Sequence, residues 1–431
     1  MTLSAEFVVE GGRPLRGTLR VPGCKGISHR ALLLAALADG RSQVSGLAEG
    51  GDVASTASAL TALGVKIKRG SDGAASIVSG GPDTFREPTS PVDCGNSGTT
   101  MRMLAGVLAG CDLHAVLVGD ESLSQRPMRR VVEPLRALGA QIDGGANATL
   151  APLSIRGGKL RGAEVQLEVA SGQVKTAVLL AGLRADGTTV VSEPFPSRDH
   201  TERMLSALGV PLQRLSDRSV SVRRGAPEPF ELHVPGDPSS AAFYVVAACL
   251  IPGSSIVIEG VSLNPARVEY LDVLREMGAS IETHVDGETV GEPYGSITVE
   301  AAALHGAEIR STEAMVDELP ALAIAAAFAE GTTTITDAAE LRVKESDRIA
   351  TLQQELAQLG IDVATADDGL VVHGGAPKGA VIKSHGDHRI ALAGAVAGLA
   401  ADGTTTVRGW RAIAVSYPDF ERDLAGLLGE A

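Results

Sequence analysis

The amino-acid sequence predicts an α/β fold built of two similar halves, each containing three α/β repeats. Two helix-turn-strand signatures recur six times along the 431 residues, and an offset of 213 residues relates the halves. The composition agrees, because 44% hydrophobic residues and 51 glycines with few aromatic residues are typical of a globular α/β protein. Disorder over most of the chain is therefore excluded.

The first signature is an Ala-rich apolar segment that reaches a glycine turn and continues into a β-branched run. Helix periodicity followed by strand periodicity predicts a helix that ends at the glycine and then a strand. The copies are LAALADGRSQVSG, GVLAGCDLHAVLVG, LAGLRADGTTVVSEP, VAACLIPGSSIVIEG, IAAAFAEGTTTITDA and AVAGLAADGTTTVRGW, with turn glycines Gly40, Gly110, Gly187, Gly253, Gly331 and Gly403.

The second signature, L-x-x-L/M-G followed by alternating apolar residues, predicts the other helix and strand of each repeat. Its glycines are Gly64, Gly139, Gly209, Gly278, Gly360 and Gly429. The last copy, LAGLLGEA, lacks the strands that should follow it. We therefore expect the N-terminal segment, residues 1–21, to supply a strand to the second half.

The two halves meet at a repeated Pro-Gly sequence, LRVPG at 19–23 and LHVPG at 232–236. Because Pro-Gly is a turn or linker signal, we place both hinges there. The expected lobes are 22–236 and 1–21 plus 237–431, with a cleft between them. An open repeat array is the alternative, but 431 residues over six repeats give repeats large enough for layered domains.

The charge balance limits the partners of the protein. With 38 basic and 52 acidic residues the net charge is −14, which argues against broad binding to nucleic acid or an anionic membrane. The longest apolar runs, 241–251 and 319–329, are shorter than the ~20 residues that cross a bilayer. The start of the chain has no secretion signal, and the four cysteines show no CxxC spacing, so we expect a reduced, cytoplasmic location.

A local basic stretch could nevertheless bind an anion. Residues 11–38 contain no acidic side chain but include Lys25 and Arg30. The sequence PGCKGISHRALLLAALA places Lys25 just ahead of a predicted helix, so its ammonium and the helix N–H groups could converge on one anion. A solvated basic turn is the alternative.

Two further segments have the composition of anion sites. CGNSGTTMR, with Asn96 and Gly98, is a turn that leads directly into an apolar helix and would expose backbone donors. It matches neither the P-loop nor the GxGxxG pattern, and a simple N-cap is the alternative. SLSQRPMRR carries Arg126, Arg129 and Arg130, of which one could bind a carboxylate or phosphate while the others are surface charges.

The second half contains the candidate acid–base residues. In LRVKESDRIATL we expect a helix start with Lys344 and Arg348 on one face, and Glu345 close enough to be tuned by both cations. An ordinary salt-bridged helix start is the alternative. Asp317 precedes the corresponding helix of the fifth repeat, where it could be only an N-cap.

SHGDHRIALAGAVAG places His385, Asp387, His388 and Arg389 ahead of another apolar helix. The two histidines could suggest a metal, but no second cluster of ligands is evident in the sequence. A capped helix with an anion-binding Arg389 is the better interpretation.

Together these motifs are similar to those of the 5-enolpyruvylshikimate-3-phosphate (EPSP) synthase family, in the same order and over nearly the whole chain. The resemblance implies an α/β fold of two lobes, each built of three βαβαββ units as an inside-out α/β barrel, joined by a double-crossover hinge with the active site in the interlobe cleft. It implies transfer of the enolpyruvyl group of phosphoenolpyruvate to the 5-hydroxyl of shikimate 3-phosphate through a tetrahedral intermediate. It also implies a monomer that needs no metal or cofactor, and a target of glyphosate.

The resemblance also assigns residues. Asp317 would take the 5-hydroxyl proton, and Glu345 and Lys25 would transfer the proton at the methylene carbon. Phosphoenolpyruvate would be bound by Lys25, Asn96, Gly98, Arg126, Arg348 and Arg389. Shikimate 3-phosphate would be bound by Lys25, Arg30, Ser171, Gln173, Arg198, Asp317 and Lys344.

The sequence departs from the family pattern at three places. Members commonly have Ser where this chain has Gly26, and some have Ser where it has Gly172. AIAVSYPDF lacks a Lys that some members have, so this phosphoenolpyruvate contact is lost or comes from Arg411. The sister family, which transfers enolpyruvyl to UDP-N-acetylglucosamine, typically has a Cys five residues before the loop Arg-Pro, where this chain has Glu121. A catalytically silent anion-binding repeat protein is the alternative of another class.

Overall fold

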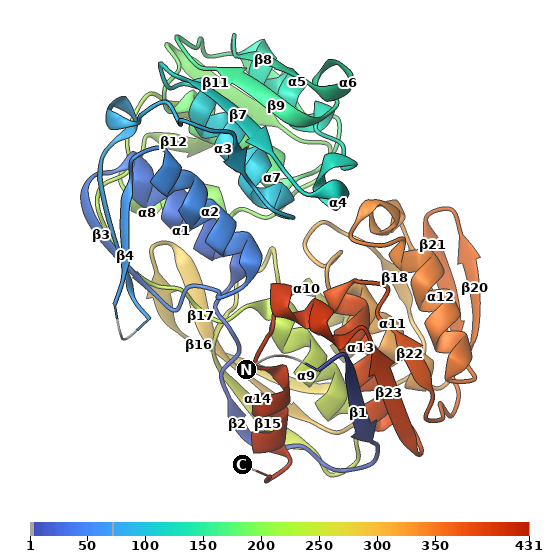
Figure 1. Cartoon of the computed structure of the whole chain (residues 1–431). Helices are drawn as coiled ribbons and strands as arrows, with labels where there is room; N and C mark the ends of the chain where they lie inside the picture. Colours follow the sequence, from blue (N-terminus) through green and yellow to red (C-terminus); the bar gives the residue numbers. More distant parts are fainter. Residues whose placement is uncertain (1–3, 71–72, 431) are drawn as a thin grey trace. The chain divides into compact units, whose positions relative to one another are not determined.

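The computed structural model describes residues 4–70 and 73–430, which form two compact lobes (Figure 1). The first lobe comprises Gly23–Val234 and Glu288–Glu292. The second lobe comprises Met1–Pro22, Pro235–Gly287 and Pro293–Ala431, apart from the residues outside the described ranges. The chain therefore passes between the lobes at both VPG sequences. In addition, the five-residue hairpin tip Glu288–Glu292 belongs with the first lobe.

The described residues of the first lobe form three four-stranded sheets. The first sheet is β14 (Glu231–His233), β3 (Asp39–Ser45), β5 (Ala75–Gly80) and β4 (Lys66–Arg69), with helices α1 (Lys25–Leu37) and α2 (Gly51–Ala62). The second is β6 (Val92–Asp93), β7 (His114–Val118), β9 (Leu150–Arg156) and β8 (Gln141–Gly144), with α3 (Gly98–Ala109), α4 (Glu121–Ser124), α5 (Arg129–Ala137) and α6 (Gly145–Ala148). The third is β10 (Glu164–Gln166), β11 (Thr188–Ser192), β13 (Ser219–Arg223) and β12 (Leu212–Arg214), with α7 (Gly172–Gly182) and α8 (His200–Ala207).

The second lobe repeats this plan, except that its last sheet has three strands in the described residues. Its first sheet is β2 (Arg16–Leu19), β15 (Ser255–Ser262), β17 (Glu292–Glu300) and β16 (Ser280–Thr289), with α9 (Pro238–Leu250) and α10 (Glu269–Glu276). The next is β18 (Glu308–Arg310), β19 (Thr332–Thr336), β21 (Gly369–His373) and β20 (Asp362–Ala366), with α11 (Leu319–Phe328), the 3-10 helix η2 (Ala339–Val343) and α12 (Arg348–Gln358). The last is β22 (Val381–Lys383), β23 (Thr404–Arg408) and β1 (Glu6–Glu10), with α13 (His388–Ala400), η3 (Trp410–Val415) and α14 (Phe420–Leu427).

Each sheet combines one parallel pair with antiparallel strands. In the third sheet β10 and β11 are parallel, whereas β11 and β12 each pair antiparallel with β13. A parallel pair needs a crossover, and α7 supplies it here. The other five sheets also contain one parallel pair each. The predicted α/β fold is therefore confirmed.

The N-terminal segment completes the second lobe, as predicted. β1 pairs antiparallel with β23, and β2 pairs parallel with β15. Strand β14 has the same role in the first lobe, where it pairs parallel with β3 although almost the whole lobe lies between them in sequence. The sheet of the truncated last repeat thus receives β1 from the opposite end of the chain, and β2 completes the first sheet of the same lobe.

We predicted that a helix ends at the glycine of each signature. This prediction is correct for the second signature and wrong in detail for the first. All six glycines of the second signature directly follow a helix C-cap with φ between 71° and 101°. In the first signature α1, α9, α11 and α13 end at an extended C-cap residue, and the glycine lies two residues further on. Because the chain already leaves the helix at the C-cap, glycine is required only in the turn into the strand.

The first helix of each repeat is buried on almost every side. In α9 only Leu250 is not fully buried, and in α11 only Phe328. Helices α3 and α7 pack at backbone distance, since a Cβ on Gly106 would lie 2.2 Å from the carbonyl oxygen of Ala177. Among the helices of the described residues, none is long and apolar enough to span a membrane.

Candidate active site

The candidate residues cluster at the N-terminal ends of these helices. Lys25 is the first residue of α1, and Gly98 is the first of α3 after the N-cap Ser97, whose hydroxyl accepts from Thr100 N. Ser171 is the N-cap of α7, and Arg389 is the second residue of α13. Unsatisfied N–H groups and the helix dipole make such ends favourable for anions. The predicted placement at helix starts is confirmed for Lys25, Gly98 and Arg389.

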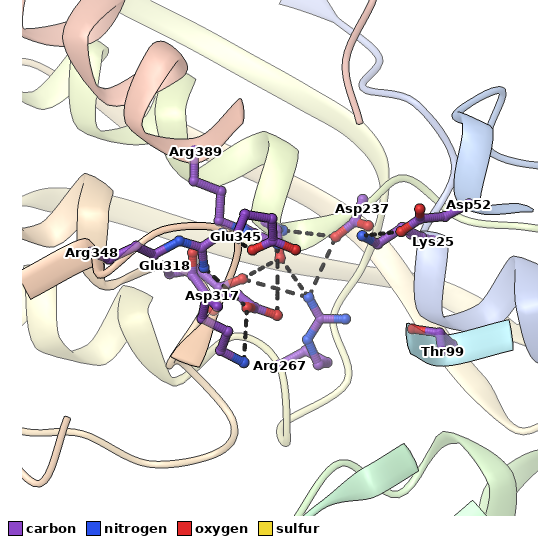
Figure 2. Close-up of polar contacts among 12 residues, drawn as sticks. Lys25, Asp52, Thr99, Asp237, Arg267, Asp317, Glu318, Glu345, Arg348 and Arg389 are labelled. Carbon is purple, nitrogen blue, oxygen red and sulfur yellow. Dashed lines mark hydrogen bonds and ion pairs between the residues drawn. The ribbon is translucent and has the colours of Figure 1, made fainter. Parts of the chain in front are cut away.

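In the second lobe, three cations lie close to Asp317, and Figure 2 labels two of them, Arg348 and Arg389. Its carboxylate oxygens lie 3.8 Å from Arg348 Nη1, 3.9 Å from Lys344 Nζ and 3.6 Å from Arg389 Nη2. Arg389 Nη1 also donates to the Asp317 carbonyl at 2.8 Å. The side chains come from the loop before α11, the turn before α12 and the starts of α12 and α13. Five predicted residues, including Glu345, are thus brought together within one lobe.

Arg348 is the buried centre of this group. Its Nε donates to Asp387 Oδ2 at 2.8 Å, and its Nη2 donates to Glu345 Oε2 at 2.7 Å and to Asp387 Oδ1 at 3.2 Å. Burial alone would lower the pKa of Arg348, but the nearby carboxylates outweigh it and raise the pKa. Burial would likewise raise the pKa of Asp387, but Arg348 holds it below the ordinary 3.8.

Two details of the predicted local structure are wrong. Lys344 and Glu345 do not lie on a helix with Arg348, because α12 begins only at Arg348, where Asp347 is the N-cap and accepts from Ala350 N at 3.1 Å. Asp317 is not the N-cap of α11 either, because Glu318 occupies that position. The side chain of Asp317 is therefore not used to cap the helix.

Asp387 has the predicted capping role and a second one. Its Oδ1 accepts from Arg389 N at 2.9 Å, which caps α13. The same carboxylate binds Arg348, so one buried acid orients the start of α13 and the Arg348 guanidinium. His385 turns away to Glu355, with Nε2 2.7 Å from Oε1.

In the first lobe, Lys25 is paired with an acid that the sequence analysis missed. Lys25 Nζ lies 3.1 Å from Asp52 Oδ2, and Asp52 is in the first turn of α2. The side chains of Lys25 and Asp52 retain 27% and 13% exposure, so the pair can still meet a small molecule. The sequence offered little signal for Asp52, since an acid in a first helical turn is common for structural reasons.

Asn96 and Arg126 contact each other, which supports their joint assignment. Arg126 Nη2 donates to Asn96 Oδ1 at 2.7 Å, and Asn96 Nδ2 donates to Asp120 Oδ2 at 2.7 Å. Of the other two arginines considered in this loop, Arg129 is exposed and Arg130 is partly buried at the start of α5.

Arg102 is a second residue that the sequence analysis missed. Its Nη1 donates to Gln173 Oε1 at 2.8 Å and its Nη2 to the Pro127 carbonyl at 3.2 Å. Gln173 Nε2 in turn donates to Thr99 Oγ1 at 3.0 Å. Arg102 thus joins the starts of α3 and α7 to the loop that carries Arg126. Its place one turn after Gly98 on the same helix was the available signal.

Arg30 is deeply buried and binds four groups of the protein. Its guanidinium donates to the carbonyl oxygens of Gly26 and Gly172 at 2.9 and 3.2 Å, and to Thr176 and Thr201 hydroxyls at 2.9 and 2.7 Å. It therefore ties α1 to α7 and α8. Both glycines that depart from the family pattern place their carbonyl oxygens against this one side chain.

The remaining predicted residues of the first lobe, Ser171 and Arg198, lie at or just before the start of a helix. Ser171 and Arg198 are partly buried, the first at the start of α7 and the second in the loop before α8. Arg411 of the second lobe lies in η3. Among the described residues there is no group of three His, Cys, Asp or Glu side chains arranged to hold a metal ion.

Comparisons with known proteins agree on one family. The family model described as EPSP synthase (3-phosphoshikimate 1-carboxyvinyltransferase) matches residues 9–424. A 3-phosphoshikimate 1-carboxyvinyltransferase of Synechococcus sp. (strain JA-3-3Ab) is 49% identical and covers 96% of this chain and 95% of the relative, and one of Bacillus pumilus is 45% identical with 94% and 96% covered. The structure of an EPSP synthase from Acinetobacter baumannii is similar with a TM-score of 0.87, at 40% identity, and covers 98% of this chain and 97% of that one.

Proposed function

The chain belongs to the EPSP synthase family, and we propose that its basic helix starts bind the two anionic substrates of that family's reaction. The reaction transfers the enolpyruvyl group of phosphoenolpyruvate to shikimate 3-phosphate and releases phosphate. The protein is thus a transferase of the shikimate pathway, which supplies aromatic amino acid biosynthesis. The observation that carries our assignment of residues is the convergence of Lys344, Arg348 and Arg389 on Asp317 in a chain of net charge −14.

We assign phosphoenolpyruvate to the residues that combine fixed cations with backbone donors. Arg348 is oriented by Asp387, and Arg389 is oriented by its bond to the Asp317 carbonyl, so little side-chain entropy remains to be lost on binding. Arg126 is held by Asn96 in the same way. The full set is Lys25, Asn96, Gly98, Arg126, Arg348 and Arg389.

We assign shikimate 3-phosphate to the starts of α1 and α7 and the loop before α8 in the first lobe, and to Asp317 and Lys344 in the second lobe. Ser171 and Gln173 can bind hydroxyl groups, and Arg198 suits a phosphate because its guanidinium presents paired donors. Arg30 contributes through the frame that it builds between α1, α7 and α8. The full set is Lys25, Arg30, Ser171, Gln173, Arg198, Asp317 and Lys344.

The chemistry requires two proton transfers. In the addition, the 5-hydroxyl oxygen of shikimate 3-phosphate bonds to the central carbon of the enolpyruvyl group, and Asp317 accepts the hydroxyl proton. The methylene carbon gains a proton from Glu345 or Lys25. In the elimination, the methyl group of the tetrahedral intermediate returns a proton to Glu345 or Lys25, the carbon–carbon double bond forms again, and phosphate leaves with the electrons of the broken carbon–oxygen bond. Lys344, Arg348 and Arg389 lie 3.6–3.9 Å from the carboxylate oxygens of Asp317 and hold this acid among the groups assigned to the substrates.

Mutation of the two acids tests these roles. General acid–base catalysis contributes about 10²–10⁴-fold, so Asp317→Ala and Glu345→Ala should each lower kcat by at least about 100-fold. Exposed Glu308 on β18 provides the control Glu308→Gln, which should keep the original kcat. Phosphate release measured with both substrates gives the result. Full activity of both acid variants would exclude this mechanism, whereas no phosphate release by the unmutated protein would favour the catalytically silent alternative.

We further propose that the protein acts as a monomer in the cytoplasm. The four cysteines are buried free thiols, which suits a reducing compartment. Burial raises the pKa of Cys94, Cys111 and Cys249 to about 12, so these thiols stay protonated and unreactive. Light scattering of the purified protein would test the monomer, and a mass of twice 44.1 kDa would contradict it.

A further inference from the structure

A buried ion cluster in the first lobe has no part in the chemistry described above. Lys175 Nζ on α7 lies 2.7 Å from Glu193 Oε1 and 2.8 Å from Glu202 Oε1. The side chains of all three residues are at most 8% exposed. Lys175 is four residues after Ser171 and two after Gln173, Glu193 follows β11, and Glu202 is on α8. The cluster therefore joins three segments that carry or flank the proposed shikimate 3-phosphate site.

The Lys175 ammonium uses all of its donors. Besides the two carboxylates it donates to the carbonyl oxygen of Ser197 at 3.3 Å. An ammonium has three N–H groups, so each has an acceptor, which is the condition for tolerating a buried charge. Burial alone would lower the pKa of Lys175, but Glu202 and Glu193 outweigh this effect and raise it. The ammonium therefore stays charged.

The same cluster fixes every polar group of Ser197. The Ser197 N–H donates to Glu193 Oε1 at 2.9 Å, and its hydroxyl donates to Glu193 Oε2 at 2.6 Å. Its carbonyl oxygen accepts from Lys175. A loop residue held at its N–H, its carbonyl and its side chain has little freedom, and Ser197 is the residue directly before Arg198.

The residue on the other side of Arg198 is also anchored. Asp199 Oδ1 accepts from Arg203 Nε at 2.9 Å, and Asp199 Oδ2 accepts from Arg214 Nη2 at 3.0 Å. The backbone of Arg198 is therefore held between two fixed residues. Since Lys175 is on the same helix as Gln173, the cluster also sets the distance between Arg198 and the start of α7.

We propose that Lys175 is a positioning residue for Arg198, so that the buried cluster sets the affinity for shikimate 3-phosphate without contacting it. The inference rests on the proposed function only through the role of Arg198. If the ammonium is removed, Ser197 loses one anchor and two buried carboxylates lose their common partner. The loop then shifts, and Arg198 no longer meets its ligand in the required geometry.

The main test compares Lys175→Met, Arg198→Ala and the double variant. A charge-assisted hydrogen bond contributes roughly 1.5–3 kcal/mol, so both single variants should raise the KM for shikimate 3-phosphate at least about tenfold. The KM for phosphoenolpyruvate at saturating shikimate 3-phosphate should change less than about twofold, because Arg198 is not among the residues assigned to phosphoenolpyruvate. If Lys175 acts through Arg198, adding Lys175→Met to Arg198→Ala should raise the KM little further.

The outcomes separate the inference from the proposed function. An unchanged KM in Arg198→Ala would overturn the assigned role of Arg198 and the inference with it. A raised KM in Arg198→Ala but not in Lys175→Met would overturn the inference alone, as would multiplicative effects in the double variant. A general loss of stability is controlled by Val178→Ala, a core truncation on the same helix that should leave both KM values unchanged.

A milder variant covers the case in which Lys175→Met does not fold. Ser197→Ala removes only the hydroxyl bond to Glu193 and leaves the buried charges paired. It should raise the KM for shikimate 3-phosphate about threefold, and again only when Arg198 is present. An unchanged KM in a folded Ser197→Ala protein, measured beside a sensitive Arg198→Ala, would contradict the positioning role.

Discussion

Replacement of Gly98 by Ala should disturb both substrates, and the structure indicates how. Gly98 is the first residue of α3, and an added Cβ would lie 3.0 Å from Arg102 Nη1 and 3.6 Å from Leu123 Cδ1. The first distance is closer than ordinary contact, but the obstacle is the end of a flexible side chain. Arg102 would therefore yield by a few tenths of an ångström while the helix stays intact.

The size of the effect follows from what Arg102 holds. Its bond to Gln173 is 2.8 Å long, and weakening it would cost about 1 kcal/mol, which is roughly a fivefold rise in the KM for shikimate 3-phosphate. The new methyl group also occupies space beside the turn where we place phosphoenolpyruvate. We therefore expect weaker binding of phosphoenolpyruvate and of compact phosphonate mimics such as glyphosate.

Steady-state kinetics with each substrate varied in turn, together with glyphosate inhibition, measures both effects. Gly51→Ala is a matched control, because Gly51 is the first residue of α2 and an added Cβ would meet nothing within 4 Å. This control should keep both KM values. Unchanged phosphoenolpyruvate KM and inhibition in Gly98→Ala would refute the placement of that substrate, and an unchanged shikimate 3-phosphate KM would refute the path through Arg102.

Two other substitutions test the frame of the site. Asp387→Asn should destabilise the protein by about 3–5 kcal/mol at pH 7, because it leaves the Arg348 charge buried without its main partner. The pKa of Asp387 in the folded protein lies below 3.8, so its carboxylate stabilises the fold above pH 3.8 and this contribution is lost as the pH falls further. In urea unfolding, the difference in free energy of unfolding between wild type and variant should therefore shrink below about pH 4. A difference that does not depend on pH would contradict this expectation. Gly26→Ser should lower the KM for shikimate 3-phosphate about threefold, because a Cβ there would lie at an ordinary contact distance of 3.6 Å from Arg30 and His200 and leave room for a hydroxyl. A raised KM would contradict this, because it would mean that the Ser side chain obstructs the ligand.

The repeat pattern in the sequence was sufficient to predict the architecture. Glycines at fixed places divide the chain into six repeats, and the truncated repeat after Gly429 indicated that the second lobe needs a strand from the other end, which β1 provides. Local signals of this kind depend on neighbouring residues only. Helix starts such as those at Lys25 and Arg389 were predictable for the same reason.

The pattern could not reveal which distant side chains share a partner. Lys175 lies in a mostly apolar segment, and its two carboxylate partners are 18 and 27 residues away in sequence. The pairing of Lys25 with Asp52 depends in the same way on how α1 and α2 pack. The hairpin tip Glu288–Glu292 was equally hidden, because its place is fixed by the buried contact of Glu292 with His200, 2.7 Å apart.

Phosphate release from phosphoenolpyruvate, measured with shikimate 3-phosphate and separately with UDP-N-acetylglucosamine as acceptor, tests the central claim most directly. The account predicts release with shikimate 3-phosphate alone, and loss of that release in Asp317→Ala and Glu345→Ala. Release with the nucleotide sugar, or with neither acceptor, would contradict it.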